Sequence, residues 1–191
     1  MLESDQIRPM RVRPLRRTEY QSLAESGAFG EEKLELIRGT LIARSPQGTA
    51  HSTAIMILTE QLILALGKRA YLRPQLPLAA GEDSMPEPDL AVIDRSLAPG
   101  KGHPSEALLV IEVANSSLNL DRNIKAPLYA EARVPEYWLV DLTQNRVEVY
   151  RAPVEGRYTQ REVVDVEGTL VVSAFPDIRL KIRDFLQPEG G

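Results

Sequence analysis

The pattern of apolar and polar positions along the chain predicts a mixture of helices and strands. Apolar residues recur at helical spacing over residues 49–66, and Gly67 supplies a stop for that helix. The unbroken apolar run of residues 107–114 predicts a strand that is buried on both faces. Residues 89–94 predict a second strand, because the prolines just before it favour an extended backbone.

Shorter segments add peripheral elements to this pattern. Thr18 predicts the N-cap of a helix over residues 18–25, with Gln21 at the reciprocal capping position. Residues 33–37 and 40–44 alternate in polarity around a glycine turn, which predicts a β-hairpin. Further strands are predicted at residues 70–73, 76–80, 136–141, 146–151 and 158–164, and further helices at residues 121–132 and 182–186.

The mixed order of these elements favours an α/β fold. Helices occur early, in the middle and at the end of the chain, so we expect an α/β/α core in which helices flank a central mixed sheet, with β-hairpins at its periphery. A chain of 191 residues is long enough for one proper core. We therefore predict a basic N-terminal arm over residues 1–17 and a single domain over residues 18–191.

Composition narrows the chemistry that the chain can perform. It contains no cysteine, which excludes disulfides, zinc–thiolate sites and thiol nucleophiles. The two histidines, His51 and His103, are too few for a histidine-rich metal site. A bound metal would be held mainly by oxygen, which favours Mg²⁺ or Mn²⁺. No unbroken apolar run of membrane length and no signal-peptide pattern is present, so we expect a cytoplasmic protein with no membrane partner.

Charge is unevenly distributed along the chain. The net charge of −4 argues against tight nucleic-acid binding over the whole surface. The N-terminal arm is nevertheless basic, and its arginines could be solvated, pair with a neighbouring subunit, or contact phosphates of DNA. The candidates for that nucleic-acid contact are Arg11, Arg13, Arg16 and Arg17, with Arg8 in the same segment.

Two carboxylates carry the strongest chemical signal. Glu112 is the one charge in the buried strand, where an isolated carboxylate needs a cation, a metal ion or its own proton. Asp89 opens the other strand, although it could be a turn residue there. Two such acids beside a lysine form the Asp…(Asp/Glu)-x-Lys signature of metal-assisted phosphodiester hydrolysis. The lysine position of that signature is occupied by Ala114.

A longer series of residues resembles a known family. The series comprises Glu35-Leu36-Ile37-Arg38-Gly39, Ser45-Pro46, His51, Glu87-Pro88-Asp89-Leu90-Ala91-Val92, Glu112-Val113, Ser116-Ser117, Asp121, Lys125, Tyr129 and Val134-Pro135-Glu136-Tyr137-Trp138-Leu139-Val140-Asp141. In this order it resembles the Uma family of restriction-endonuclease-like proteins, within the PD-(D/E)XK nuclease superfamily. The resemblance covers roughly residues 18–150. It implies the restriction-endonuclease-like fold and a lysine that has moved to the following helix, here Lys125.

Each candidate residue also has a simpler interpretation. Lys125 could be the i+4 ion-pair partner of Asp121 on an exposed helix face. Glu35 could be a further inward-pointing acid or a solvent-facing strand residue. His51 could contact the site or act as a polar contact at the start of its helix. The candidate catalytic residues are Asp89, Glu112 and Lys125, with metal held by Asp89 and Glu112 and possible additional roles for Glu35 and His51.

Three functional hypotheses follow. The first is a Mg²⁺- or Mn²⁺-dependent endonuclease that hydrolyses DNA, for which a homodimer or higher homo-oligomer is plausible because duplex cleavage needs two cuts. The second is a non-catalytic nuclease-fold module that binds nucleic acid or a partner protein, an interpretation favoured by Ala114 and the acidic net charge. The third is an oligomer with a vestigial site, in which the arginine arm joins subunits.

Overall fold

A six-stranded mixed sheet forms the centre of the computed structural model, which describes residues 13–44, 46–97 and 102–187. Its strand order is β3-β4-β5-β6-β7-β8, so the buried strand β5 lies inside the sheet. The strands are β3 (Ala70–Pro74), β4 (Leu90–Asp94), β5 (Leu109–Ala114), β6 (Glu136–Asp141), β7 (Arg146–Val154) and β8 (Arg157–Asp165). All six residues of β5 are buried, which confirms the prediction of a strand covered on both faces.

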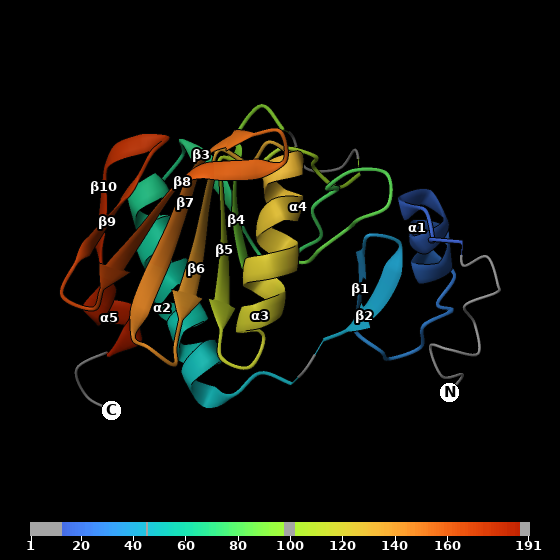
Figure 1. Ribbon diagram of the computed structural model, residues 1–191, viewed down its shortest axis with the longest axis horizontal. Coiled ribbons are helices and arrows are strands. Elements are labelled where there is room, and N and C mark those ends of the chain that lie inside the picture. Colours follow the sequence, from blue (N-terminus) through green and yellow to red (C-terminus); the bar gives the residue numbers. More distant parts are fainter. Residues whose placement is uncertain (1–12, 45, 98–101, 188–191) are drawn as a thin grey trace.

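Helices cover both faces of this sheet (Figure 1). On one face lie α2 (Thr49–Leu66), α5 (Ile182–Leu186) and the hairpin of β9 (Thr169–Val172) and β10 (Phe175–Lys181). On the other face lies a continuous helical segment built from α3 (Leu118–Leu120), η1 (Asp121–Lys125) and α4 (Ala126–Glu131). The predicted α/β/α core is therefore confirmed.

The register of the central strands brings the two candidate acids together. Strand β4 pairs antiparallel with β5, with Leu90 opposite Ile111, and β5 pairs parallel with β6. Asp89 directly precedes β4 and Glu112 directly follows Ile111. The two carboxylates therefore lie beside each other, because both side chains leave neighbouring strands at the same level of the sheet.

A smaller unit beyond the α3–α4 segment completes the structure. It consists of α1 (Arg17–Glu25) and the hairpin of β1 (Leu34–Ile37) and β2 (Thr40–Ala43). The loop before β4 bonds to this hairpin, because Met85 N donates to Leu36 O at 2.7 Å and Gly39 N donates to Asp83 O at 2.7 Å. These bonds hold the hairpin close to the start of β4, where Asp89 lies.

Several local predictions were wrong. Residues 76–80 form no strand, and their amides instead donate to loop carbonyls of Ser84, Pro86 and Pro104. The first helix is capped by Arg16, whose N–H donates to the Glu19 carboxylate at 2.9 Å, and not by Thr18. The hairpin of β9 and β10 was not predicted, since Pro176 and Asp177 interrupt its pattern.

The helix predicted over residues 121–132 is longer and irregular. It begins at Leu118 and contains a π-helical turn at Asp121–Lys125, where Ala126 N donates to Asp121 O. Pro127 follows at once and has no N–H to donate, so regular α-helical bonding fails at this point.

Helix α2 is long and apolar enough to cross a membrane by length and composition alone. Its mean hydropathy is 1.3 over Thr49–Leu66, and 22% of that window is buried. Its inward residues, including Ala54, Leu58 and Leu62, pack on the sheet. The core helix of a globular domain passes the same test, so this observation carries no membrane assignment.

Candidate active site

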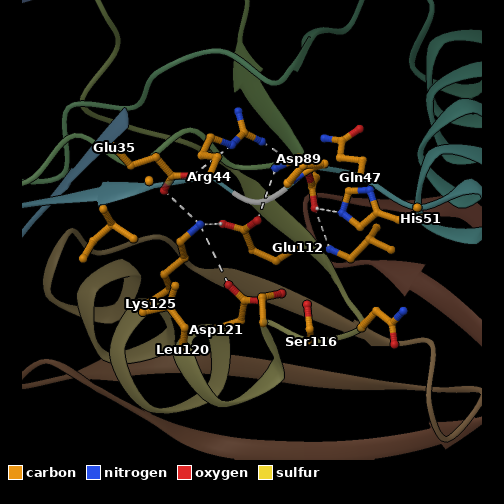
Figure 2. A pocket seen from close by; sticks show the side chains of 17 residues that line it. Glu35, Arg44, Gln47, His51, Asp89, Glu112, Ser116, Leu120, Asp121 and Lys125 are labelled. Carbon is orange, nitrogen blue, oxygen red and sulfur yellow. Dashed lines mark hydrogen bonds and ion pairs between the residues drawn. The ribbon is translucent and has the colours of Figure 1, made fainter. Parts of the chain in front are cut away.

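A cleft of about 370 Å³ opens where β1–β2, the start of α2, the β4–β5 pair and η1 meet (Figure 2). All five candidates for the site, Glu35, His51, Asp89, Glu112 and Lys125, line it. They come from five different elements or loops that lie far apart in the sequence. The structure therefore brings the whole predicted set to one place.

Asp89 and Glu112 are held rigidly at the floor of this cleft. Asp89 Oδ2 accepts a hydrogen bond from the backbone N–H of Val113 at 2.9 Å and lies 3.2 Å from His51 Nε2. Glu112 Oε1 accepts a bond from the Tyr129 hydroxyl at 2.6 Å, and its Oε2 lies 3.4 Å from Asp89 N. Both side chains are at least 95% buried, so their orientation is fixed by protein groups and not by bulk water.

Lys125 reaches the acids from the helical segment. Its Nζ lies 3.1 Å from Glu112 Oε1 and 3.0 Å from Glu35 Oε2. The alternative i+4 pairing with Asp121 is also present, but it is longer, at 3.8 Å. Lys125 is 6% exposed in its side chain, so it is not the solvent-exposed helix lysine of the simpler interpretation.

The π-helical turn explains how this lysine reaches the cleft. The wider turn of η1 presents both Asp121 and Lys125 as buried residues of the same segment. A regular α-helix rotates successive side chains by about 100°, whereas a π-helical turn holds an extra residue and so changes the direction of the side chains before Pro127. Such π-bulges occur often at functional sites. Lys125 thus places an ammonium group beside Glu112, although position 114 of β5 holds an alanine.

Glu35 and His51 also point into the cleft, as Figure 2 shows. Glu35 is buried, and its Oε2 makes no well-aligned hydrogen bond among the described residues although Lys125 Nζ is near. His51 stands in the first turns of α2 and contacts Asp89 through Nε2. Its buried Nδ1 has no hydrogen-bond partner within the described chain.

Two further charged residues of the cleft were not among the sequence candidates. Arg44, next to the end of β2, faces three carboxylates. Asp121 belonged to the series that resembles the family and was considered as a partner of Lys125, but not as a site residue, yet it lines the cleft and is buried. The sequence did place Arg44 at the end of the strand that pairs with the strand of Glu35. Strand pairing alone, however, does not determine the direction in which a long arginine side chain points.

Burial and neighbouring charges shift the pKa values of the central groups. Burial, opposed by Lys125 and reinforced by Asp121, Asp89 and Glu35, raises the pKa of Glu112 to about 8. Burial by itself lowers the pKa of Lys125, but Glu112, Glu35 and Asp121 outweigh it and raise that pKa above its usual value. Lys125 therefore stays protonated at neutral pH.

The donor chemistry of the cleft fits a hard divalent cation. Acidic side chains that line the cleft outnumber its Arg and Lys side chains four to two: Glu35, Asp89, Glu112 and Asp121 against Arg44 and Lys125. In residues 13–44, 46–97 and 102–187, however, no three such side chains already form a metal-ligand group. Mg²⁺ commonly uses one or two carboxylates and completes its shell with water and substrate phosphate. Asp89 and Glu112 match that pattern.

The predicted arginine arm lies apart from the cleft where it is described. Arg11 lies outside the described residues. Arg13 pairs with Glu19 at 2.9 Å, and Arg17 Nε donates to Gly81 O at 2.8 Å. Arg16 caps α1 through its backbone, and none of Arg13, Arg16 and Arg17 lines the cleft. Their contact with nucleic acid stays a prediction.

These features define a restriction-endonuclease-like protein, and comparison with known proteins agrees. Residues 17–183 match the model of the Uma2 family, described as "Putative restriction endonuclease". The chain belongs to this family.

The fold also matches a solved structure. A protein from Anabaena variabilis ATCC 29413, described as a "putative nuclease belonging to DUF820", superposes with a TM-score of 0.72 at 23% identity. The match covers 91% of this chain and 98% of the other. At this identity the likeness establishes the fold alone. No curated protein matches the chain.

Proposed function

We propose that this protein is a Mg²⁺- or Mn²⁺-dependent endonuclease that hydrolyses phosphodiester bonds of DNA. The observation that carries the proposal is the position of Lys125 Nζ, 3.1 Å from Glu112 Oε1, although the lysine comes from a helix and not from β5. Membership of a nuclease-like family supports the same reaction class. Asp89 and Glu112 are the proposed metal ligands.

Each residue of the cleft has its own role in the proposed reaction. A bound divalent ion would polarise the phosphate and lower the pKa of the attacking water. Lys125, which stays protonated, orients that water and stabilises the negative charge that develops on the phosphate, but it does not act as a base. His51 and the Val113 amide orient Asp89, and Tyr129 orients Glu112. Glu35, which lines the cleft beside Lys125, is the proposed acceptor of the proton of the water.

The test is Mn²⁺ binding by calorimetry together with cleavage of supercoiled plasmid. We expect Glu112→Ala to lose Mn²⁺ binding and to abolish cleavage while circular dichroism stays unchanged. Glu131→Ala is the matched control, because Glu131 pairs with Arg38 at 2.8 Å outside the cleft. Cleavage retained by Glu112→Ala would contradict the mechanism.

A non-catalytic module is the alternative, and two observations favour it. Ala114 stands at the superfamily lysine position, and the described chain contains no preformed group of three metal-ligating side chains. Such a module would bind nucleic acid or a partner protein without hydrolysis. Metal-dependent turnover that Asp89→Ala destroys would rule this alternative out.

A further inference from the structure

Arg44 holds a position in the cleft that the proposed mechanism does not use. Its side chain is 17% exposed, and each nitrogen of its guanidinium faces a different carboxylate. Figure 2 shows Arg44 beside two of them, Glu35 and Asp89. Nε lies 3.2 Å from Glu35 Oε1, Nη1 lies 2.8 Å from Glu87 Oε2, and Nη2 lies 3.7 Å from Asp89 Oδ1. One residue of the β1–β2 hairpin is thus shared among three acids.

These three contacts are unequal. The contact with Glu87 is a hydrogen-bonded ion pair, whereas the distance to Asp89 exceeds that of a hydrogen bond. Arg44 is therefore anchored at Glu87 and held only electrostatically at Asp89. The guanidinium can move away from Asp89 without losing its anchor. Lys125 differs, because it is more deeply buried and lies close to both Glu35 and Glu112.

Arg44 also competes with any cation that Asp89 would bind. Carboxylates that converge on a cleft repel one another unless a positive charge lies between them, and Arg44 supplies this charge beside Asp89. A divalent ion on Asp89 would provide the same compensation and would repel the guanidinium. A displaced guanidinium in a nuclease cleft has a suitable new partner, since its planar fork matches the oxygens of a phosphate.

We propose that Arg44 exchanges partners during the reaction: it neutralises Asp89 and Glu35 in the metal-free protein and contacts the phosphate backbone of the substrate when a divalent ion occupies Asp89. This inference rests on the proposed function and assigns a regulatory and substrate-positioning residue to the same cleft. Glu87 remains the anchor in both states. The exchange keeps the acidic cleft folded without metal and links metal binding to substrate contact.

The experiment measures Mn²⁺ binding without nucleic acid, and then plasmid cleavage at saturating Mn²⁺. Removing the competing charge in Arg44→Gln should tighten Mn²⁺ binding about tenfold and slow cleavage roughly 100-fold. Arg44→Lys keeps the positive charge but loses the planar guanidinium that can make two hydrogen bonds to a phosphate. Mn²⁺ affinity should therefore stay within about threefold of the wild type, while cleavage falls. Arg38→Gln is the matched control, because it removes an ion-paired arginine of the same hairpin outside the cleft.

Thermal unfolding in EDTA and in excess Mn²⁺ adds a readout that does not depend on activity. Arg44→Gln should be less stable than the wild type in EDTA, and saturating Mn²⁺ should narrow this difference. If the wild type and Arg44→Gln bind Mn²⁺ equally, the exchange is overturned and the proposed metal site stands. If neither protein binds Mn²⁺ without nucleic acid, the exchange is overturned, and the proposed function is overturned as well if the wild type also fails to cleave the plasmid in Mn²⁺. If Mn²⁺ binding appears only in Arg44→Gln, the competition is supported directly.

Discussion

The sequence around Glu112 correctly predicted its burial and a compensating cation, but it did not identify the other side chains near the site. Its isolation in an apolar strand predicted a buried carboxylate with a compensating partner, and Lys125 lies 3.1 Å away. The same argument did not identify the Tyr129 hydroxyl as a second donor, at 2.6 Å. Nor did it identify Arg44, which is separated from Asp89 by 45 positions in the sequence but by 3.7 Å in the structure.

The raised pKa of Glu112 predicts that Mn²⁺ binding releases a proton. Its pKa of about 8 lies above the ordinary 4.5, so the folded protein binds one more proton than the unfolded chain between these values. The contribution of Glu112 to stability therefore falls as pH rises through that window. A metal ligand must be deprotonated, so near pH 6.5 we expect about one proton released per ion, declining above pH 8.

Calorimetry in two buffers of different ionisation enthalpy measures this release. Glu131→Ala provides the control, since Glu131 lies outside the cleft and this variant should release the same number of protons as the wild type. Heats that do not depend on the buffer near pH 6.5 would mean that Glu112 is either ionised already or not a ligand.

At the scale of elements, the position of the β1–β2 hairpin determines which charged groups line the cleft, because the hairpin supplies both Glu35 and Arg44. The hairpin was predicted from alternation and a glycine turn, but its place next to the start of β4 depends on loop contacts. Leu15 N donates to Gly39 O at 3.0 Å, and Met85 N donates to Leu36 O. Gly39 has a φ of 73° and packs against Pro14, whose Cα would lie 2.9 Å from an added Cβ.

Gly39→Ala should therefore destabilise the protein and weaken its site. Positive φ costs an alanine about 1–2 kcal/mol, and the clash with Pro14 adds about 1–3 kcal/mol. Gly27→Ala is a matched control, because Gly27 also has a φ of 73° but nothing lies within 4 Å of its added Cβ. Urea unfolding should show the larger loss for Gly39→Ala. Equal losses would mean that the Pro14 contact contributes nothing.

At the scale of the whole molecule, charge is separated between an acidic cleft and a basic N-terminal segment. The net charge of −4 does not favour DNA, so residues outside the cleft must supply attraction to phosphates if the protein binds it. Arg13 and Arg17 are engaged with Glu19 and Gly81, whereas Arg8 and Arg11 lie outside the described residues. The expected homodimer stays a prediction.

Deleting residues 1–12 tests the role of this segment without removing Leu15 and Arg17, whose amides bond to the rest of the protein. If Arg8 and Arg11 contact phosphates, DNA affinity should fall and the slope of log K against log salt should shrink by up to about 1.8. Sedimentation should show an unchanged number of subunits, expected to be two; for the full-length chain of 21.3 kDa, this means twice that mass. A change in mass with unchanged DNA affinity would instead assign the arm to subunit contacts.

The sequence by itself determined the buried strands and the α/β/α class, and it singled out Asp89 and Glu112, which the structure places in one cleft, because periodicity and a lone charge in an apolar run are local signals. The family resemblance indicated Lys125 as the lysine of the site, but only the tertiary structure decided how Lys125 and Arg44 reach those acids. Lys125 enters through a π-helical turn before Pro127, and Arg44 enters from a hairpin held by loop hydrogen bonds. Both depend on how separate elements pack, and side-chain contacts between such elements leave no fixed spacing in the chain.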